Sequence, residues 1–272
     1  MLVHFLGTAA FEGIPSLFCT CELCVKAKAA GGKNIRTRTS VLFDNELKVD
    51  FPPDTLLHML RDGIDMEDMK DIIITHTHSD HLYPDDLVAR LPGYAQAKDH
   101  TIHVYGNDAA IRIIHDTLVL NGGDHGKFEL HRVRPFERTE LRTAVVTALP
   151  ASHNPMETCY VYYIEKNGKT VFYGHDSGRF PEETWRWLEG KPVDLAILEC
   201  TMGNIPYDVG HMNVDAVLDA QKRMAETGML RAGAKIAVTH FSHNAHLLHE
   251  DLTDIFAPHG IEVAFDGMRL EI

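Results

Sequence analysis

A short motif in the first third of the chain places the strongest constraint on the fold. The apolar run Ile72-Ile73-Ile74 leads directly into Thr75-His76-Thr77-His78-Ser79-Asp80-His81. Imidazole nitrogens and carboxylate oxygens are the ligands that borderline divalent ions such as Zn²⁺ prefer. An apolar strand that ends in these side chains presents them at the edge of a sheet rather than in its core. The motif therefore predicts a metal site at a sheet edge.

Three further apolar segments end in side chains that can bind a metal. They are residues 145–149 before His153, residues 170–173 before His175 and Asp176, and residues 236–239 before His240. Each has a plain alternative when taken alone, since Asp176 could be a turn residue and His153 could cap a loop. Functional groups gather on loops at the ends of a rigid scaffold. The repetition therefore favours one shared site.

Strand-like and helical segments recur along the whole chain. Alternating or apolar runs predict strands at residues 2–6, 40–43, 47–51, 72–75, 102–105, 128–133, 144–149, 160–165, 170–173, 195–199, 235–239 and 262–265. Helical periodicity is present at residues 54–61, 84–91, 108–120, 214–227 and 246–256. These elements predict two sheets packed face to face with helices outside. No linker or repeat divides the chain, so we expect one domain over residues 1–272.

Three cysteines near the N-terminus form a second metal-binding pattern. Cys19, Cys21 and Cys24 follow a Cys-x-Cys-x-x-Cys spacing, and a tetrahedral structural zinc site needs one further ligand. His243 is the strongest candidate because it lies three residues after His240, so its side chain can turn away from the first site. The alternative is three free or buried cysteines. Cys159 and Cys200 lie in strand patterns and are expected in the core.

Charge and cysteine usage narrow the class of protein. The formal net charge of −13 argues against broad electrostatic binding to nucleic acid or to an anionic membrane. Neither a signal peptide nor an apolar stretch of ~20 residues is evident, so no membrane association is expected. Five cysteines, three of them clustered, are more typical of a reducing compartment than of a disulfide framework. These features predict a cytoplasmic protein.

The four strand-end motifs, in this order, resemble the ligand set of the metallo-β-lactamase superfamily. The resemblance implies a four-layer αββα sandwich of the α/β class with two divalent metals at one edge of its sheets. By the same resemblance one metal would be held by His76, His78 and His153, the other by Asp80, His81 and His240, and Asp176 would bridge the two. Ligand types alone do not choose among Mn²⁺, Zn²⁺ and Fe²⁺.

The cysteine run narrows this resemblance. With Gly7-Thr8-Ala9-Ala10, Pro15 and His240-Phe241-Ser242-His243, it resembles the PhnP-type phosphodiesterases of the carbon–phosphorus lyase (phosphonate catabolism) pathway. The resemblance implies a structural zinc and a phosphodiesterase that opens 5-phosphoribosyl 1,2-cyclic phosphate. A hydroxide that bridges the two metals would then attack the small phosphodiester substrate. The resemblance also makes a homodimer plausible.

Cleavage of a phosphodiester requires a proton for the departing alkoxide. We predict that His211, directly before the helix expected at residue 214, supplies it, with Asp80 as the second catalytic residue. The plain alternative for His211 is a solvent-exposed residue in a helix-capping loop. Arg36 and Arg38 could anchor a phosphate, but solvated loop positions are favoured for both. The remaining histidines, among them His100, His103, His115, His125 and His131, are expected on the surface.

Three other functions remain open. A hydrolase of lactones, thioesters or β-lactams would have less use for a general acid at His211. A tRNase Z-like nuclease is disfavoured by the acidic charge balance. A non-enzymatic, PqqB-like protein of a cofactor pathway should lack several of the seven ligands, and all seven are present.

Overall fold

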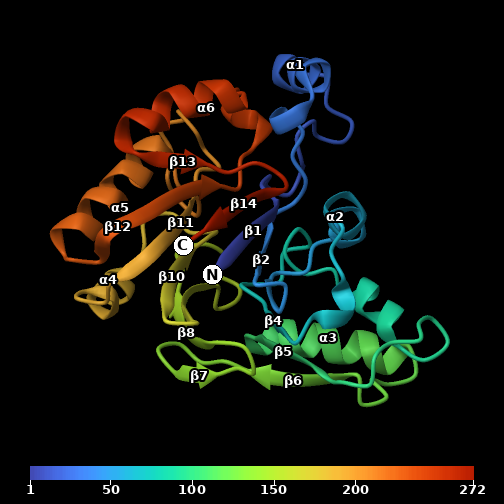
Figure 1. Cartoon of the computed structure of the whole chain (residues 1–272). Helices are drawn as coiled ribbons and strands as arrows, with labels where there is room; N and C mark the ends of the chain where they lie inside the picture. Colours follow the sequence, from blue (N-terminus) through green and yellow to red (C-terminus); the bar gives the residue numbers. More distant parts are fainter.

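The computed structural model describes residues 1–272, which form two mixed sheets packed face to face with helices on their outer faces (Figure 1). Each sheet has seven strands. The strand order is β14-β1-β2-β3-β4-β5-β6 in the first sheet and β13-β12-β11-β10-β9-β8-β7 in the second. The predicted αββα sandwich is confirmed.

The first sheet carries the N-terminal half of the chain and its last strand. Its strands are β1 (Leu2–Gly7), β2 (Ser40–Phe43), β3 (Leu47–Val49), β4 (Asp71–Ile73), β5 (Ile102–Gly106), β6 (Phe128–Arg132) and β14 (Met268–Glu271). The second sheet consists of β7 (Arg138–Glu140), β8 (Val145–Pro150), β9 (Tyr160–Lys166), β10 (Lys169–Gly174), β11 (Val193–Glu199), β12 (Leu230–Thr239) and β13 (Ile261–Val263). A tight turn at Asn167-Gly168 joins β9 to β10.

Six α-helices cover the sheets. They are α1 (Glu22–Ala30), α2 (Thr55–Asp62), α3 (Asp108–Leu120), α4 (Glu182–Leu188), α5 (Val214–Glu226) and α6 (His249–Phe256). Buried residues of α4, α5 and α6 pack on the outer face of the second sheet, whereas α3 packs on the first. A third apolar cluster, with members such as Phe5, Val49, Tyr162 and Ile197, fills the space between the sheets. No helix has both the length and the apolar content that a membrane crossing requires.

The topology collects several strand ends at one edge of the sandwich. Strands β10, β11 and β12 are parallel, and β8 runs in the same direction because both β8 and β10 pair antiparallel with β9. Loops that follow parallel strands leave a sheet at the same edge. The segments after β8, β10, β11 and β12 therefore share one rim, which the segment after β4 in the first sheet faces.

Several elements differ from the sequence-based expectation. Helices α1 and α4 and strands β7 and β14 were not predicted, because they are short and bury few apolar side chains. The helix expected at residues 84–91 is a 3₁₀-helix, Pro84–Arg90. Its buried Leu87 and Arg90 lie three residues apart, which places them on one face of a helix with three residues per turn.

Candidate metal centre

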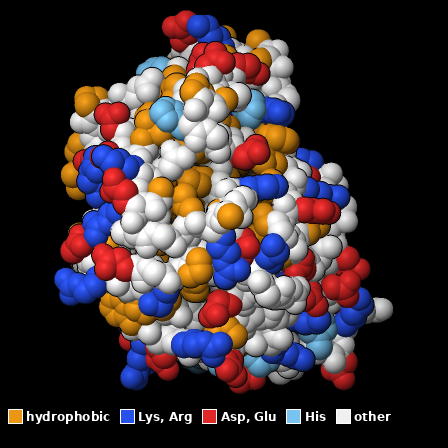
Figure 2. Space-filling view, turned by 60° about the vertical axis from the view of Figure 1, so that its left-hand side comes forward, with side chains coloured by type: hydrophobic (Ala, Val, Ile, Leu, Met, Phe, Trp, Pro, Cys, Tyr) orange, Lys and Arg blue, Asp and Glu red, His pale blue; other side chains and the backbone are white.

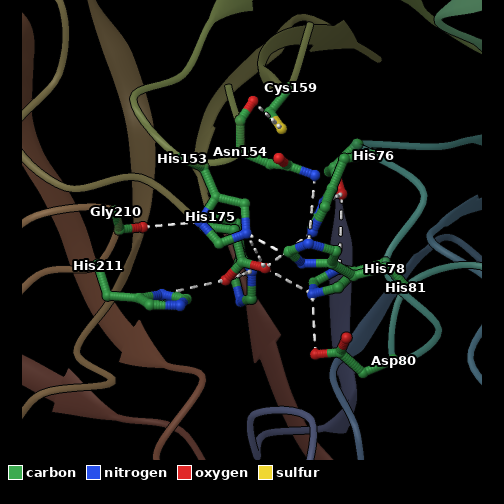
Figure 3. A network of polar contacts seen from close by, with 12 residues as sticks. His76, His78, Asp80, His81, His153, Asn154, Cys159, His175, Gly210 and His211 are labelled. Carbon is green, nitrogen blue, oxygen red and sulfur yellow. Dashed lines mark hydrogen bonds and ion pairs between the residues drawn. The ribbon is translucent and has the colours of Figure 1, made fainter. Parts of the chain in front are cut away.

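The predicted metal ligands meet at the shared rim. His76, His78, Asp80 and His81 follow β4, His153 follows β8, Asp176 follows β10 and His240 follows β12. The imidazoles of His76, His78, His81 and His153 point toward one another, and His211 approaches the same point from the opposite side (Figure 3). A cleft of about 490 Å³ opens onto this cluster and is lined in part by His78, Asp80, Asp176, His211 and His240.

The Asp176 carboxylate lies at the centre of this group. Its Oδ2 is 2.7 Å from His81 Nε2, 3.5 Å from His76 Nε2 and 4.0 Å from His153 Nε2. Its Oδ1 is 3.1 Å from His240 Nε2. The two oxygens therefore face different imidazoles, as a bridging carboxylate requires.

The other ligands fall into two groups around Asp176. Donor atoms of His76, His78 and His153 all lie within 4.8 Å of one another, and His153 Nε2 is 3.1 Å from His78 Nδ1. Asp80 Oδ2 is 3.3 Å from His81 Nε2 and 3.5 Å from His240 Nε2. The structure thus brings all seven residues together in the grouping that the resemblance implied, although their role as metal ligands stays a prediction.

Unpartnered polar atoms indicate that these residues fit divalent ions. His76 Nε2, His81 Nε2, His240 Nε2 and Asp176 Oδ1 are buried and make no hydrogen bond. A buried polar atom without a partner costs ~1–3 kcal/mol. Their convergence on one space is difficult to explain by packing alone. Divalent ions would give each of these atoms a partner.

The charge distribution is consistent with bound cations. Burial alone would raise the pKa of the Asp176 carboxyl, but His240 and His81 hold that pKa well below its ordinary value. Burial keeps the pKa of His76 and His153 low, so both imidazoles remain neutral and able to coordinate. Burial also opposes protonation of His81, yet the carboxylates of Asp176, Asp80 and Asp50 raise its pKa well above the ordinary value. This surplus of carboxylates is what a cation would neutralise.

Four of the imidazoles are fixed from behind by a hydrogen bond at Nδ1. His81 Nδ1 is 2.7 Å from Asp50 Oδ2, and His76 Nδ1 is 3.0 Å from Thr75 Oγ1. His153 Nδ1 donates to the Gly210 carbonyl oxygen at 2.8 Å, and His240 Nδ1 is 2.7 Å from Thr201 Oγ1. Such bonds set the tautomer and leave Nε2 free for a metal. Sequence reasoning missed Asp50 and Thr201, although each follows an apolar strand.

A further imidazole, His175, is part of the same cluster. It is fully buried, its ring stacks on Tyr173, and its Nε2 is 3.2 Å from Thr39 Oγ1. Its side chain lies within 4.8 Å of ligand atoms of His81, Asp176 and His240. His175 follows a predicted strand, but the sequence alone did not indicate a function for it.

The backbone is strained at two of the central residues. Asp176 has a φ of 46° and His240 a φ of 58°. Both values lie in the left-handed region, which residues other than glycine rarely adopt. Such conformations cluster at functional sites, where the surrounding structure must hold them. They aim two side chains from adjacent loops into the same cleft.

His211 borders the cleft and is held by a buried glutamate. Its Nδ1 is 2.9 Å from Glu199 Oε1 and 3.9 Å from Asp176 Oδ1. Burial opposes protonation, but the negative charges of Glu199 and Asp176 prevail and raise the pKa of His211 to about 9. The preceding loop does cap α5, through the Asn213 side chain that accepts from Ala216 N, but His211 itself is not a freely solvated residue, because its side chain is 27% exposed and held by Glu199. Glu199, at the end of β11, was missed by sequence reasoning.

The three cysteines and His243 also come together. His243 Nδ1 is 3.6 Å from Cys19 Sγ and 3.5 Å from Cys21 Sγ, and all four ligand atoms lie within 4.8 Å of one another. A hydrogen bond from the Cys24 backbone N–H lowers the pKa of Cys21 to about 6, whereas burial raises that of Cys24 to about 12. Zinc would stabilise the Cys24 thiolate that burial disfavours. Cys159 and Cys200 are buried, as predicted.

The solvated position expected for Arg36 is wrong. Its guanidinium is buried and donates to Thr8 Oγ1 at 2.7 Å and to the Ala264 carbonyl oxygen at 2.6 Å. A guanidinium can be buried when its donors are satisfied in this way. Arg38 pairs with Asp54 at 3.3 Å, and neither arginine lines the cleft.

Comparisons with known proteins agree with this geometry. Residues 49–241 match the family model described as the β-lactamase superfamily domain. A structure described as a new diphosphatase from the PhnP family has a TM-score of 0.77 and 25% identity, and the alignment covers 100% of this chain and 97% of that one. No functionally curated protein matches the sequence.

Two other solved structures share the fold at lower identity. Zn²⁺-bound PqqB from Methylobacterium extorquens has a TM-score of 0.76 and 17% identity, and both chains are covered completely. The short form of human tRNase Z has a TM-score of 0.70 and 19% identity, with 100% of this chain and 99% of the other covered. These two similarities concern the fold alone.

Replacement of Cys24 by serine tests the cysteine site. Cys24→Ser should bind one zinc per chain fewer than the unaltered protein and have a lower Tm, because three remaining ligands hold the ion less tightly. Elemental analysis and thermal unfolding measure both effects. Cys200→Ala is the control, since it removes a buried thiol outside the cluster. Equal zinc contents in Cys24→Ser and the unaltered protein would contradict the assignment.

Replacement of Asp50 by asparagine tests the support behind His81. Asp50→Asn preserves the shape of the side chain but removes the charge that orients His81, so affinity for one catalytic metal should fall ~10–100-fold. Metal titration of the apoprotein provides the measurement. Asp54→Asn, which affects a carboxylate paired with Arg38 instead, should titrate like the unaltered protein. Unchanged metal affinity in Asp50→Asn would exclude this role.

Proposed function

Since the chain belongs to the metallo-β-lactamase superfamily and resembles its PhnP family, we propose that it is a dinuclear, metal-dependent phosphodiesterase. Its substrate would be a small cyclic phosphodiester such as phosphoribosyl 1,2-cyclic phosphate. The observation that carries the proposal is the His211–Glu199 pair, 2.9 Å apart, beside the seven clustered ligands.

The proposed metals would be held by the two groups of side chains around Asp176. Two divalent ions there, Mn²⁺, Zn²⁺ or Fe²⁺, would supply Lewis acidity for the phosphoryl oxygens and a nucleophilic hydroxide near neutral pH. His76, His78 and His153 would hold one ion, and Asp80, His81 and His240 the other. Asp80, whose Oδ2 lies near both His81 Nε2 and His240 Nε2, would be a metal ligand and a catalytic residue.

His211 would act as the general acid. Its Nδ1 is engaged by Glu199, so Nε2 is the nitrogen available to a substrate in the cleft. With a pKa raised to about 9, the imidazole carries a proton at neutral pH. It can therefore protonate the alkoxide that leaves a phosphodiester. Thioester hydrolysis releases a weakly basic thiolate and makes less use of such a donor, which favours the phosphodiester over the thioester, whereas the substrate comparison below separates phosphodiesters from lactones.

The lining of the cleft offers no lysine or arginine side chain to a phosphate group. None of its 13 lining residues is Lys or Arg, and Glu12, Asp80 and Asp176 are acidic. The metals would thus be the main counter-charge for a single phosphodiester group. The PhnP-family relative is described as a diphosphatase, so a diphosphate ester belongs in the substrate comparison.

The remaining alternatives have less support. A tRNase Z-like activity requires an extended surface for RNA, but acidic and basic side chains are interspersed over the face in Figure 2. A PqqB-like binding role does not account for the Glu199-supported His211 beside the cleft. We further propose a single domain, a cytoplasmic location, one structural zinc at Cys19, Cys21, Cys24 and His243, and a homodimeric state implied by the resemblance.

A substrate panel with two leaving groups tests the proposal. Metal-reconstituted protein should hydrolyse phosphoribosyl 1,2-cyclic phosphate and alkyl phosphodiesters faster than lactones, thioesters or diphosphate esters. His211→Ala should lower kcat ~10²–10⁴-fold for an alkyl leaving group but much less for an activated aryl leaving group, which departs without a proton. Metal content should not change in this variant.

Two results would overturn the proposal. Turnover of lactones or thioesters without phosphodiester turnover would exclude the substrate class. An equal loss of kcat for alkyl and aryl leaving groups in His211→Ala would exclude the general-acid role while leaving the substrate class intact.

The Glu199 charge predicts the pH dependence of the reaction. His211 is protonated below its pKa, so kcat should fall as the pH rises through about 9. Glu199→Gln removes the negative charge that raises this pKa and should move the basic limb of the kcat profile to lower pH by more than ~1 unit. Glu140→Gln is the control, because it removes the charge of an exposed glutamate that does not contact His211. A basic limb at the same pH in Glu199→Gln would rule out this coupling.

A further inference from the structure

A second group of histidines lies far from the catalytic cleft. His103 is in β5, and Glu129 and His131 are in the adjacent parallel strand β6. His103 is the second residue of β5 and pairs in register with Asp71, the first residue of β4. His76 comes five residues after Asp71, which is about 16 Å of extended chain. This group therefore belongs to the opposite rim of the first sheet.

The three side chains have the spacing of a metal site. His103 Nδ1 is 2.9 Å from His131 Nε2. Glu129 reaches both imidazoles, with Oε1 at 3.5 Å from His131 Nε2 and Oε2 at 3.8 Å from His103 Nε2. Ligands of a tetrahedral zinc ion are about 3.3 Å apart. The His103 Nδ1–His131 Nε2 and His131 Nε2–Glu129 Oε1 separations lie on either side of that value, and one ligand atom from each of the three residues lies within 4.8 Å of the others.

The surroundings restrict the two imidazoles, whereas Glu129 is 59% exposed. The ring of His131 is nearly parallel to its two aromatic neighbours, with its centroid 4.6 Å from that of Tyr105 and 5.1 Å from that of His103. Both histidines are partly exposed, in agreement with the surface position expected from sequence. Burial lowers the pKa of His131, so its imidazole is neutral and its lone pair is available.

A buried carboxylate supplies an independent indication of a cation. Asp71 is fully buried, and its Oδ2 accepts hydrogen bonds from Thr143 N at 2.8 Å and Thr143 Oγ1 at 2.6 Å. Its Oδ1 has no hydrogen-bond partner. Register pairing on parallel strands puts Asp71 on the same face as His103. A hydrogen bond between the two imidazoles alone would explain the 2.9 Å contact but neither Glu129 nor Asp71.

We propose that His103, Glu129 and His131 bind a further divalent transition ion such as Zn²⁺, independent of the catalytic and cysteine sites. Two imidazoles and a carboxylate are a ligand set that such ions accept. Asp71 adds negative charge beside the ion. Because β6 is the edge strand of the first sheet, the ion would cross-link that edge to β5.

Zinc stoichiometry tests this site. Untagged protein, with its catalytic and cysteine sites already filled with zinc, is dialysed against rising concentrations of buffered Zn²⁺, and bound zinc is measured by elemental analysis. The unaltered protein should bind one zinc per chain more than His131→Gln at saturation. Glu129→Gln should require at least ~10-fold more free zinc for half-saturation of that last equivalent, because it loses one of three ligands.

His115→Gln is the matched control, since His115 is an exposed histidine on α3 outside the group. It should bind as much zinc as the unaltered protein. If His131→Gln does not fold, His103→Gln takes its place in the comparison. Equal zinc binding by the unaltered protein and the folded histidine variant would overturn the proposal.

Nitrogen-15 NMR of the imidazole side chains provides a second readout. Zinc should shift the resonances of His103 Nδ1 and His131 Nε2 in the unaltered protein, and neither should shift in Glu129→Gln at the same low zinc concentration. Absence of a shift in the unaltered protein would also overturn the proposal. Phosphodiesterase activity should be the same in all these variants, so the result is independent of the proposed function.

Discussion

The buried Asp176 carboxylate is the charge around which the rest of the rim is arranged. A negative group without contact to water must be compensated, and here four imidazoles from three separate loops approach its two oxygens. The loops can reach it because β8, β10 and β12 run in one direction and end at the same rim. The sandwich thus converts sequence positions far apart in the chain into one cluster of ligands.

Hydrogen bonds from residues behind the clustered ligands hold the imidazoles in their orientations. Asp50 orients His81 from the end of β3, and Thr201 orients His240 from the end of β11. Glu199 contacts both His211 and Thr201, with Thr201 Oγ1 donating to its Oε2 at 2.5 Å. The proposed proton donor and one proposed metal ligand therefore share a single buried carboxylate. Substitution of Glu199 should therefore affect both the proposed proton donor His211 and, through Thr201, the proposed metal ligand His240.

The sequence was sufficient for the first layer of this site because strand periodicity and ligand chemistry are local signals. His153, Asp176 and His240 each follow an apolar run, and the fold only has to bring those ends together. Glu199 and Asp50 also come after apolar residues, but a lone carboxylate at the end of a strand is common and its partner is distant in the chain, so neither was recognised. Arg36 was misplaced for a related reason: its burial depends on acceptors at Thr8 and Ala264. Short elements such as α1 and β14 were missed because nine and four residues are too few for their periodicity to be recognised.

The left-handed backbone at Asp176 limits which residues the chain can tolerate there. Asparagine and aspartate adopt this conformation more readily than other residues with a side chain, and glycine adopts it freely. Glycine brings no carboxylate and asparagine brings no charge, whereas glutamate is longer and less suited to the backbone. Aspartate alone satisfies the conformational and the chemical requirement together. An exchange to glutamate, conservative by charge, is therefore a severe change at this position of the fold.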